Sequence, residues 1–138
     1  MEPKSAWERE QQLGVAAIDS EHQLQSRLVA VLKDAVEAGR EQAVISEILR
    51  RVEDTSNVHF MSEELLMRLD AYENYGQHVE EHRLLLAQLA ELRARYDADP
   101  GVDLKPSIGW VEEWLSSHIK HMDRRFTESM LKHKAGVP

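Results

Sequence analysis

The sequence predicts an all-α fold, an antiparallel up-down-up-down four-helix bundle with an N-terminal arm. Apolar residues recur at alternating steps of three and four in four long segments, which is the period of a helix with one buried face. The 138 residues include only four prolines and six glycines, and these fall near the expected ends of the segments. Short connections between long helices favour antiparallel neighbours.

The N-terminal half is predicted to hold the arm and two helices. Residues 1–17 form the polar arm, and the first helix starts with Asp19 as its N-cap and stops at Gly39. An aspartate caps free amides at a helix start, and a glycine adopts the left-handed conformation that ends a helix. The second helix is expected over residues 41–69.

The C-terminal half is predicted to hold the other two helices. The third spans residues 75–96 and follows a short polar break at 70–74. A loop rich in proline, glycine and aspartate follows at 97–106. The fourth helix is expected over 107–132, with Ser107 as its N-cap.

Length and composition limit the possible classes of protein. The whole chain, 1–138, is expected to form one domain that ends in a tail at 133–138. A formal net charge of −8 argues against nucleic acid or an anionic membrane as a partner. The sequence has no cysteine, which excludes disulfides, thiolate nucleophiles and cysteine-ligated metals. No apolar run approaches the ~20 residues of a membrane span and no signal peptide is visible, so a cytoplasmic location is expected.

Two of the predicted helices carry pairs of side chains that can bind a metal. His59 and Glu63 are four residues apart, and so are His78 and His82. Each pair therefore lies on one helix face, with its Cβ atoms about 5–6 Å apart. Both pairs fall on the apolar stripe, where a carboxylate without a partner costs several kcal/mol or is driven neutral. A metal ion would supply the partner.

Three further residues extend this candidate site. His22 lies on the stripe of the first helix, and His118 lies on that of the fourth. Asp123 follows His118 by five residues, about 140° around an ideal helix, so the two converge only from adjacent faces or if the helix loosens locally. His121 and His133 are expected in solvent. An antiparallel bundle brings the candidates to one level: His22, His59, Glu63, His78, His82, His118 and Asp123.

Seven ligands are too many for one ion, because zinc takes four and an octahedral metal six. Two metal ions fit. If both carboxylates bridge, five imidazole nitrogens and the carboxylate oxygens make nine bonds, and a bridging oxide or hydroxide makes two more. Two octahedral ions need twelve, so one position stays open for a small molecule.

This residue set resembles the hemerythrin family, in particular its single-domain bacterial members. The likeness rests on H-F-M-S-E-E from His59, H-V-E-E-H from His78 and H-I-K-H-M-D from His118. It also includes the lead-in L-G-V-A-A-I-D-S-E-H, which ends at His22, and it extends over residues 7–132.

The resemblance implies how the ligands are used. Two non-haem iron ions per chain would be bridged by Glu63, Asp123 and an oxide or hydroxide. Three histidines would complete one iron and two would leave the other five-coordinate: His78, His82 and His118 for the first, His22 and His59 for the second. O2 would bind reversibly at the open iron, for oxygen transport, storage or sensing, and the chain would not be an enzyme.

Reversible binding also requires that water be kept away from the open iron. Gln25 follows His22 by one turn, where a bulky apolar residue is expected. Either Gln25 turns to a helix interface and bonds a backbone carbonyl, or it contacts the bound ligand and promotes autoxidation. Four apolar residues flank the ligands and are expected to line the pocket, or simply to belong to the core: Phe60, Trp114, Leu115 and Ile119.

Two other functions stay open. A di-iron enzyme acting on peroxide or nitric oxide would use the same ligands. Residues 78–82 also match H-x-x-E-H, the motif of inverted zinc peptidases, but that reading leaves His22, His59, Glu63 and His118 without a role. Binding is favoured because no acid, base or substrate pocket remains once the seven ligands are assigned. Whether the chain has a protein partner, and which, is not indicated by the sequence.

Overall fold

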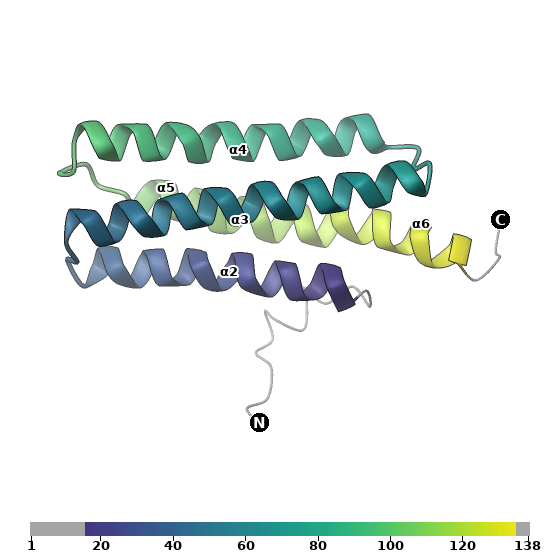
Figure 1. Ribbon diagram of the computed structural model, residues 1–138, viewed down its shortest axis with the longest axis horizontal. Coiled ribbons are helices and arrows are strands. Elements are labelled where there is room, and N and C mark those ends of the chain that lie inside the picture. The colour runs from purple at the N-terminus through teal and green to yellow at the C-terminus, as the bar shows by residue number, and fades with distance from the viewer. Residues whose placement is uncertain (1–15, 135–138) are drawn as a thin grey trace, which may run out of the picture.

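The computed structural model describes residues 16–134, which form an antiparallel four-helix bundle (Figure 1). The predicted fold class is confirmed, and residues 16–134 contain no strand. The first three helices are α2 (Ala16–Glu37), α3 (Gln42–Leu69) and α4 (Tyr75–Ala98). The fourth is a continuous rod made of α5 (Lys105–His118), the π-helical turn η1 (Ile119–Asp123) and α6 (Arg124–Lys134). None of the described helices is both long enough and apolar enough to cross a membrane.

The start of α2 differs from the prediction. The helix begins at Ala16, inside the segment predicted as an arm, and Asp19 lies in its first turn instead of capping it. A carboxylate in the first turn still faces the positive end of the helix dipole, so the residue type suits this position. The rest of the predicted arm, residues 1–15, lies outside the described residues.

The end of α2 agrees with the prediction of a stop at Gly39. Gly39 has a φ of 65°, the left-handed conformation. Its amide bonds the carbonyl of Val36 at 3.1 Å, and the amide of Arg40 bonds the carbonyl of Ala35 at 3.0 Å. These two bonds satisfy the last carbonyls of the helix and turn the chain toward α3.

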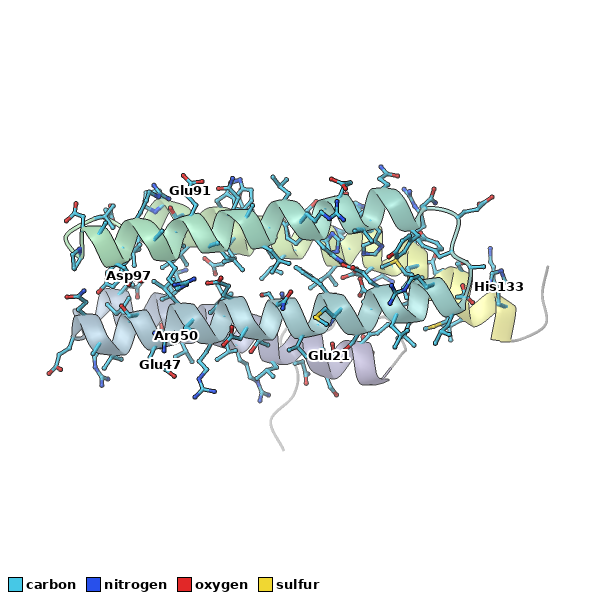
Figure 2. All side chains as sticks on the ribbon, turned by 45° about the horizontal axis from the view of Figure 1, so that its top comes forward. Glu21, Glu47, Arg50, Glu91, Asp97 and His133 are labelled. Carbon is cyan, nitrogen blue, oxygen red and sulfur yellow. The ribbon has the colours of Figure 1, made fainter. Side chains whose placement is uncertain are left out.

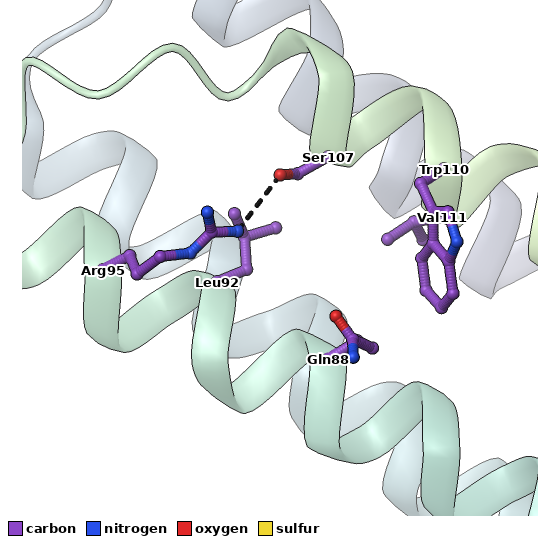
Figure 3. Close-up of a pocket in the computed structure, with 6 residues that line it drawn as sticks. All are labelled: Gln88, Leu92, Arg95, Ser107, Trp110 and Val111. Carbon is purple, nitrogen blue, oxygen red and sulfur yellow. Dashed lines mark hydrogen bonds between the residues drawn. The ribbon is translucent and has the colours of Figure 1, made fainter.

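The fourth helix starts earlier than predicted, and Ser107 does not cap it. Leu104 is the N-cap, and Pro106 lies in the first turn, where its missing amide hydrogen leaves no bond unmade. The hydroxyl of Ser107 instead accepts a hydrogen bond from the guanidinium of Arg95 at 3.3 Å. Figure 3 shows this contact in a groove of about 160 Å³ between α4 and α5.

At the end of the bundle where α3 turns into α4, two segments differ from the prediction. The break between α3 and α4 is not purely polar, because Tyr72 is 8% exposed and its ring centroid lies 5.1 Å from that of Phe126. The predicted tail is helical as far as Lys134. His133 is exposed, as predicted, and its Nδ1 lies 2.9 Å from a carboxylate oxygen of Asp70.

Two apolar clusters enclose the level of the predicted site. His118 lies in the chain between Leu115 of the larger cluster and Ile119 of the smaller one. The two histidines of α4 likewise fall between Tyr72 of the smaller cluster and Leu85 of the larger. The polar layer therefore has apolar packing on both sides along the bundle. The smaller cluster consists of buried Ile18, Met67, Tyr72, Ile119 and Phe126.

Candidate metal centre

The four helices bring the seven predicted ligands together in the interior. Each of the seven side chains is at most 2% exposed. Their donor atoms form two groups, and within each group the atoms lie within 4.8 Å of one another. The first group is Glu63, His78, His82, His118 and Asp123, and the second is His22, His59, Glu63 and Asp123. Glu63 and Asp123 belong to both groups.

The two oxygens of Glu63 face different groups. Oε1 lies 2.8 Å from Nε2 of His78 and 3.2 Å from Nε2 of His82. Oε2 lies 3.6 Å from Nε2 of His59 and 4.0 Å from Nε2 of His22. The carboxylate thus spans the space between the two sets of histidines.

Asp123 is arranged in the same way. Its Oδ1 lies 2.7 Å from Nε2 of His78 and 3.0 Å from Nε2 of His118. Its Oδ2 lies 2.9 Å from Nε2 of His22. Both carboxylates therefore offer one oxygen to each group.

The π-helical turn explains how Asp123 reaches His118. An ideal α-helix would place these residues on different faces, whereas the wider turn over 119–123 brings a residue five positions later back to the same side. Local loosening of the helix, one of the two solutions predicted for this spacing, is confirmed. Single π turns inside α-helices often occur at functional sites.

The donor atoms fit a bound cation. Nε2 of His59 and both carboxylate oxygens of Glu63 are buried and have no hydrogen-bond partner. Nε2 of His118 lies 3.1 Å from Nε2 of both His78 and His82. So many converging lone pairs need protons or metal ions between them, because buried polar atoms without partners are costly.

Burial and the closeness of the charged groups shift the pKa values of the ligands. Burial lowers the pKa of His82 to about 4, with Glu63 opposing, so this imidazole is neutral at pH 7 and able to bind a metal. Burial also lowers the pKa of His118, but Asp123 and Glu81 outweigh it and raise that pKa to about 10. Burial raises the pKa of Asp123, yet His118 more than offsets this and holds it well below its usual value. Without a metal, Asp123 and Glu81 keep a proton on His118, which a metal would displace.

Three glutamates that sequence reasoning missed bond the outer nitrogens of the ligand rings. Such bonds orient the ring and select the tautomer whose Nε2 is free to bind a metal. The only sequence signal is that each glutamate adjoins a predicted ligand in the chain, although each bonds a histidine of another helix. The pairs are Glu21 with His59 at 2.5 Å, Glu64 with His82 at 2.8 Å and Glu81 with His118 at 3.2 Å.

These bonds also bear on the zinc-peptidase alternative. Glu81 is the acid that the H-x-x-E-H motif would use, and it bonds Nδ1 of His118. That nitrogen is on the opposite side of the ring from the converging Nε2 atoms. Glu81 therefore supports a ligand from outside the site instead of facing the space in which a metal would lie.

Aromatic rings stack against two of the predicted ligands. Phe60 lies parallel to His82, with ring centroids 3.9 Å apart. Trp114 lies parallel to His118, with centroids 4.5 Å apart. Leu115 and Ile119, the other predicted wall residues, are 3% and 1% exposed. His121, by contrast, is exposed, as predicted.

Gln25 is buried between α2 and α3. Its side chain is 1% exposed, and its amide nitrogen donates a hydrogen bond of 2.9 Å to the hydroxyl of Ser56. The predicted turn toward a helix interface is observed, but the partner is this hydroxyl and not a backbone carbonyl. The pairing of Ser56 with Gln25 had no signal in the sequence.

Comparison with known proteins supports the same assignment. The Hemerythrin HHE cation binding domain matches residues 13–128. The bacteriohemerythrin of Pseudomonas paraeruginosa is 30% identical over 126 residues, which are 90% of this chain and 80% of that protein. The bacteriohemerythrin of Stenotrophomonas maltophilia is 25% identical over 130 residues, which are 92% of this chain and 82% of that protein.

A further relative matches over a shorter part of the chain. Myohemerythrin-1 of Phascolopsis gouldii is 32% identical over 78 residues, which are 56% of this chain and 60% of that protein. No solved structure matches the chain. Because the family match spans residues 13–128 and includes both donor groups, this chain belongs to the hemerythrin family.

Proposed function

We propose that this chain binds O2 reversibly at a non-haem di-iron centre held by the two donor groups. The observation that carries the proposal is that Glu63 and Asp123 each offer one oxygen to each group. Two cations held close together repel each other, and anionic oxygens between them offset this repulsion. The two carboxylates would therefore hold both irons, together with an oxide or hydroxide.

The donors are divided unequally between the two sites. The first group contributes three histidines and the second only two. An iron held by His22 and His59 would therefore have one protein ligand fewer than an iron held by the three histidines of the first group. This is where an octahedral ion would have room for O2.

Bound ferrous iron would supply the electrons with which O2 is held and recover them when O2 leaves. The chain's own residues make that exchange reversible. Five neutral imidazoles and two carboxylates give the metals less negative charge than the four glutamates and two histidines of carboxylate-rich di-iron proteins, and so favour the ferrous state. Phe60 and Trp114 cover ligand rings and help to exclude water.

The outer carboxylates hold the ligand rings in position. Glu21, Glu64 and Glu81 accept hydrogen bonds from Nδ1 and leave the opposite nitrogen directed at the metals. Because they lie on the side of the rings away from the converging Nε2 atoms, these groups are poorly placed to exchange protons with a substrate. This arrangement supports O2 binding over turnover.

The test is a visible spectrum of iron-loaded protein, reduced without oxygen and then exposed to air, with iron counted per chain. We expect two irons per chain and an absorption band that appears with air and bleaches when oxygen is removed. A single metal per chain, zinc in place of iron, or a band that never bleaches would contradict the proposal. Steady consumption of peroxide or nitric oxide would instead indicate a di-iron enzyme.

A further inference from the structure

A row of exposed apolar side chains covers the outer face of α3 at its ligand-bearing half. Val58, Met61, Leu65 and Leu69 follow one another at steps of three and four and are 62%, 62%, 49% and 75% exposed. Leu24 of α2 is 52% exposed and lines a groove of about 280 Å³ together with Val58. We name these five residues the α3 stripe. Contiguous apolar surface of this kind marks an interaction site more often than apolar residues scattered singly.

The earlier part of the same helix face is charged. Glu47 and Arg51 precede Val58 by three turns and two turns, and Arg51 bonds Glu47 at 2.9 Å. Glu47 and its neighbour Arg50 extend into solvent from this part of α3 (Figure 2). On this face of α3, exposed apolar side chains thus occur only in the part that carries the metal ligands. Apolar residues scattered at random over the helix surface would not be restricted to that part.

The stripe borders the outer carboxylates of two ligand histidines. Glu21 lines the same groove as Val58 and bonds His59, and its side chain is 35% exposed. Glu64 adjoins Leu65 in the chain and bonds His82, and its side chain is 23% exposed. On each path inward from this surface, an outer carboxylate is followed by the ligand imidazole that it bonds, and then by the proposed irons.

Charge at the edge of the stripe identifies the kind of partner. Glu21 and Asp54 line the groove together with Arg51, whose charge is paired with Glu47. Farther along α3, Arg68 lies near Glu64, so acidic groups outnumber basic ones at this edge. The whole chain carries a net charge of −8. A second copy would bring like charges together, whereas a partner with basic residues around an apolar face would be complementary.

We propose that the α3 stripe is the docking surface of an electron-transfer protein whose apolar contact face is ringed by lysine and arginine. This inference rests on the proposed function, because an iron pair that has become ferric must be reduced before it takes up O2 again. Each ferric iron gains one electron, and the partner's redox centre loses one. Contacts of this kind are small and transient, which suits a single row of apolar residues.

Two leucines of equal exposure provide a matched test. Leu65 in the stripe and Leu84 on α4 are both 49% exposed. Ferricytochrome c, a basic electron-transfer protein, serves as the probe and is mixed without oxygen with the reduced, iron-loaded chain. Two molecules of cytochrome each take one electron, and stopped-flow absorbance follows their reduction. We expect Leu65→Lys to slow this reaction about tenfold at low ionic strength, and Leu84→Lys to change it by less than about twofold.

Sedimentation at low ionic strength gives a second readout that does not depend on electron transfer. We expect a complex of the chain with cytochrome c that Leu65→Lys weakens and Leu84→Lys preserves. Equal effects of the two variants, or none, would overturn the proposal, and so would a self-associated chain that Leu65→Lys converts to monomer. Loss of the reversible O2 spectrum in the unaltered protein would reject the proposed function alone, because sedimentation still reports docking.

Discussion

At the scale of the residue, Glu63 shows most directly that this interior is built for a cation. Its carboxylate is buried, both oxygens lack a hydrogen-bond partner, and four imidazole nitrogens lie within 4.0 Å of them. A buried carboxylate needs positive charge beside it, and a position between two metals would satisfy both oxygens. Without metals, protons on the surrounding imidazoles must balance this charge.

We expect Glu63→Gln to lower the iron content from two per chain to one or fewer. The amide is neutral and one of its two ends is a hydrogen-bond donor, so it cannot bridge two cations. Metal analysis and the O2 spectrum provide the measurement. Glu80→Gln is the control, because Glu80 is exposed and pairs only with Arg83 on the surface. Two tightly held irons in the Glu63 variant would refute the bridging role.

Gln25 offers a separate test of the pocket. Its amide is engaged by Ser56, so we expect Gln25→Leu to leave the autoxidation rate unchanged and to lower the free energy of unfolding by about 1–2 kcal/mol. Adding Ser56→Ala should recover part of that loss, because the hydroxyl left without its donor is then removed. Denaturant unfolding and the decay of the oxygenated spectrum measure the two effects. A changed autoxidation rate would show that Gln25 contacts the bound ligand.

At the scale of the element, the π turn in the fourth helix has the clearest functional consequence. Residues 119–123 form a single turn that contains one residue more than a turn of α-helix. This wider turn aligns Asp123 with His118, and Ile119 and Met122 stay buried. Among the described helices, η1 is the only π-helical segment. It runs from the residue after His118 to Asp123, so it connects two of the ligands.

Insertion of one alanine after Lys120, which is exposed, tests this role. Asp123 would then follow His118 by six positions, about 240° around a regular α-helix, so we expect it to leave the face that carries His118. The chain should keep its helical circular dichroism, since the larger apolar cluster lies on the other side of the site, but lose tight iron binding. Lys120→Ala keeps the turn and should bind two irons. Full iron binding by the insertion variant would show that this alignment is not required.

At the scale of the whole molecule, the site is a polar layer between two apolar clusters of different size. The larger cluster joins residues of all four helices and does not depend on the ligands. The smaller one has five fully buried members and lies beyond the histidines, toward the turn between α3 and α4. The metals would thus stabilise the end of the bundle that has less packing of its own.

Iron removal should therefore loosen the molecule unequally. A ligand present at about a hundred times its Kd adds about 2.7 kcal/mol to the free energy of unfolding, so we expect the metal-free protein to melt about 10 °C lower. Hydrogen exchange should rise at amides near Tyr72 and Phe126 more than at those near Leu49 and Leu92, which belong to the larger cluster. Uniform exchange, or an unchanged Tm, would contradict this division.

Much of the bundle follows from local information. The periodic stripes of α3 and α4 predict their extents to within two residues, because a buried face repeats along the helix itself. Helix starts are less well predicted: Asp19 and Ser107 are suitable caps that the structure does not use, and in α5 the buried Leu104 takes that position one turn earlier. The buried position of Tyr72 was missed because its partner, Phe126, is far away in the chain.

The sequence by itself determined the helical fold and the candidate set of seven ligands, because helical spacing fixes which side chains share a buried face. Only the tertiary structure decided which oxygen of Glu63 or Asp123 faces which histidines and that the helix widens between His118 and Asp123. It also decided that Glu21, Glu64 and Glu81 support histidines on other helices. These pairings depend on how separate helices rotate and shift against one another, and no period within a single helix specifies that.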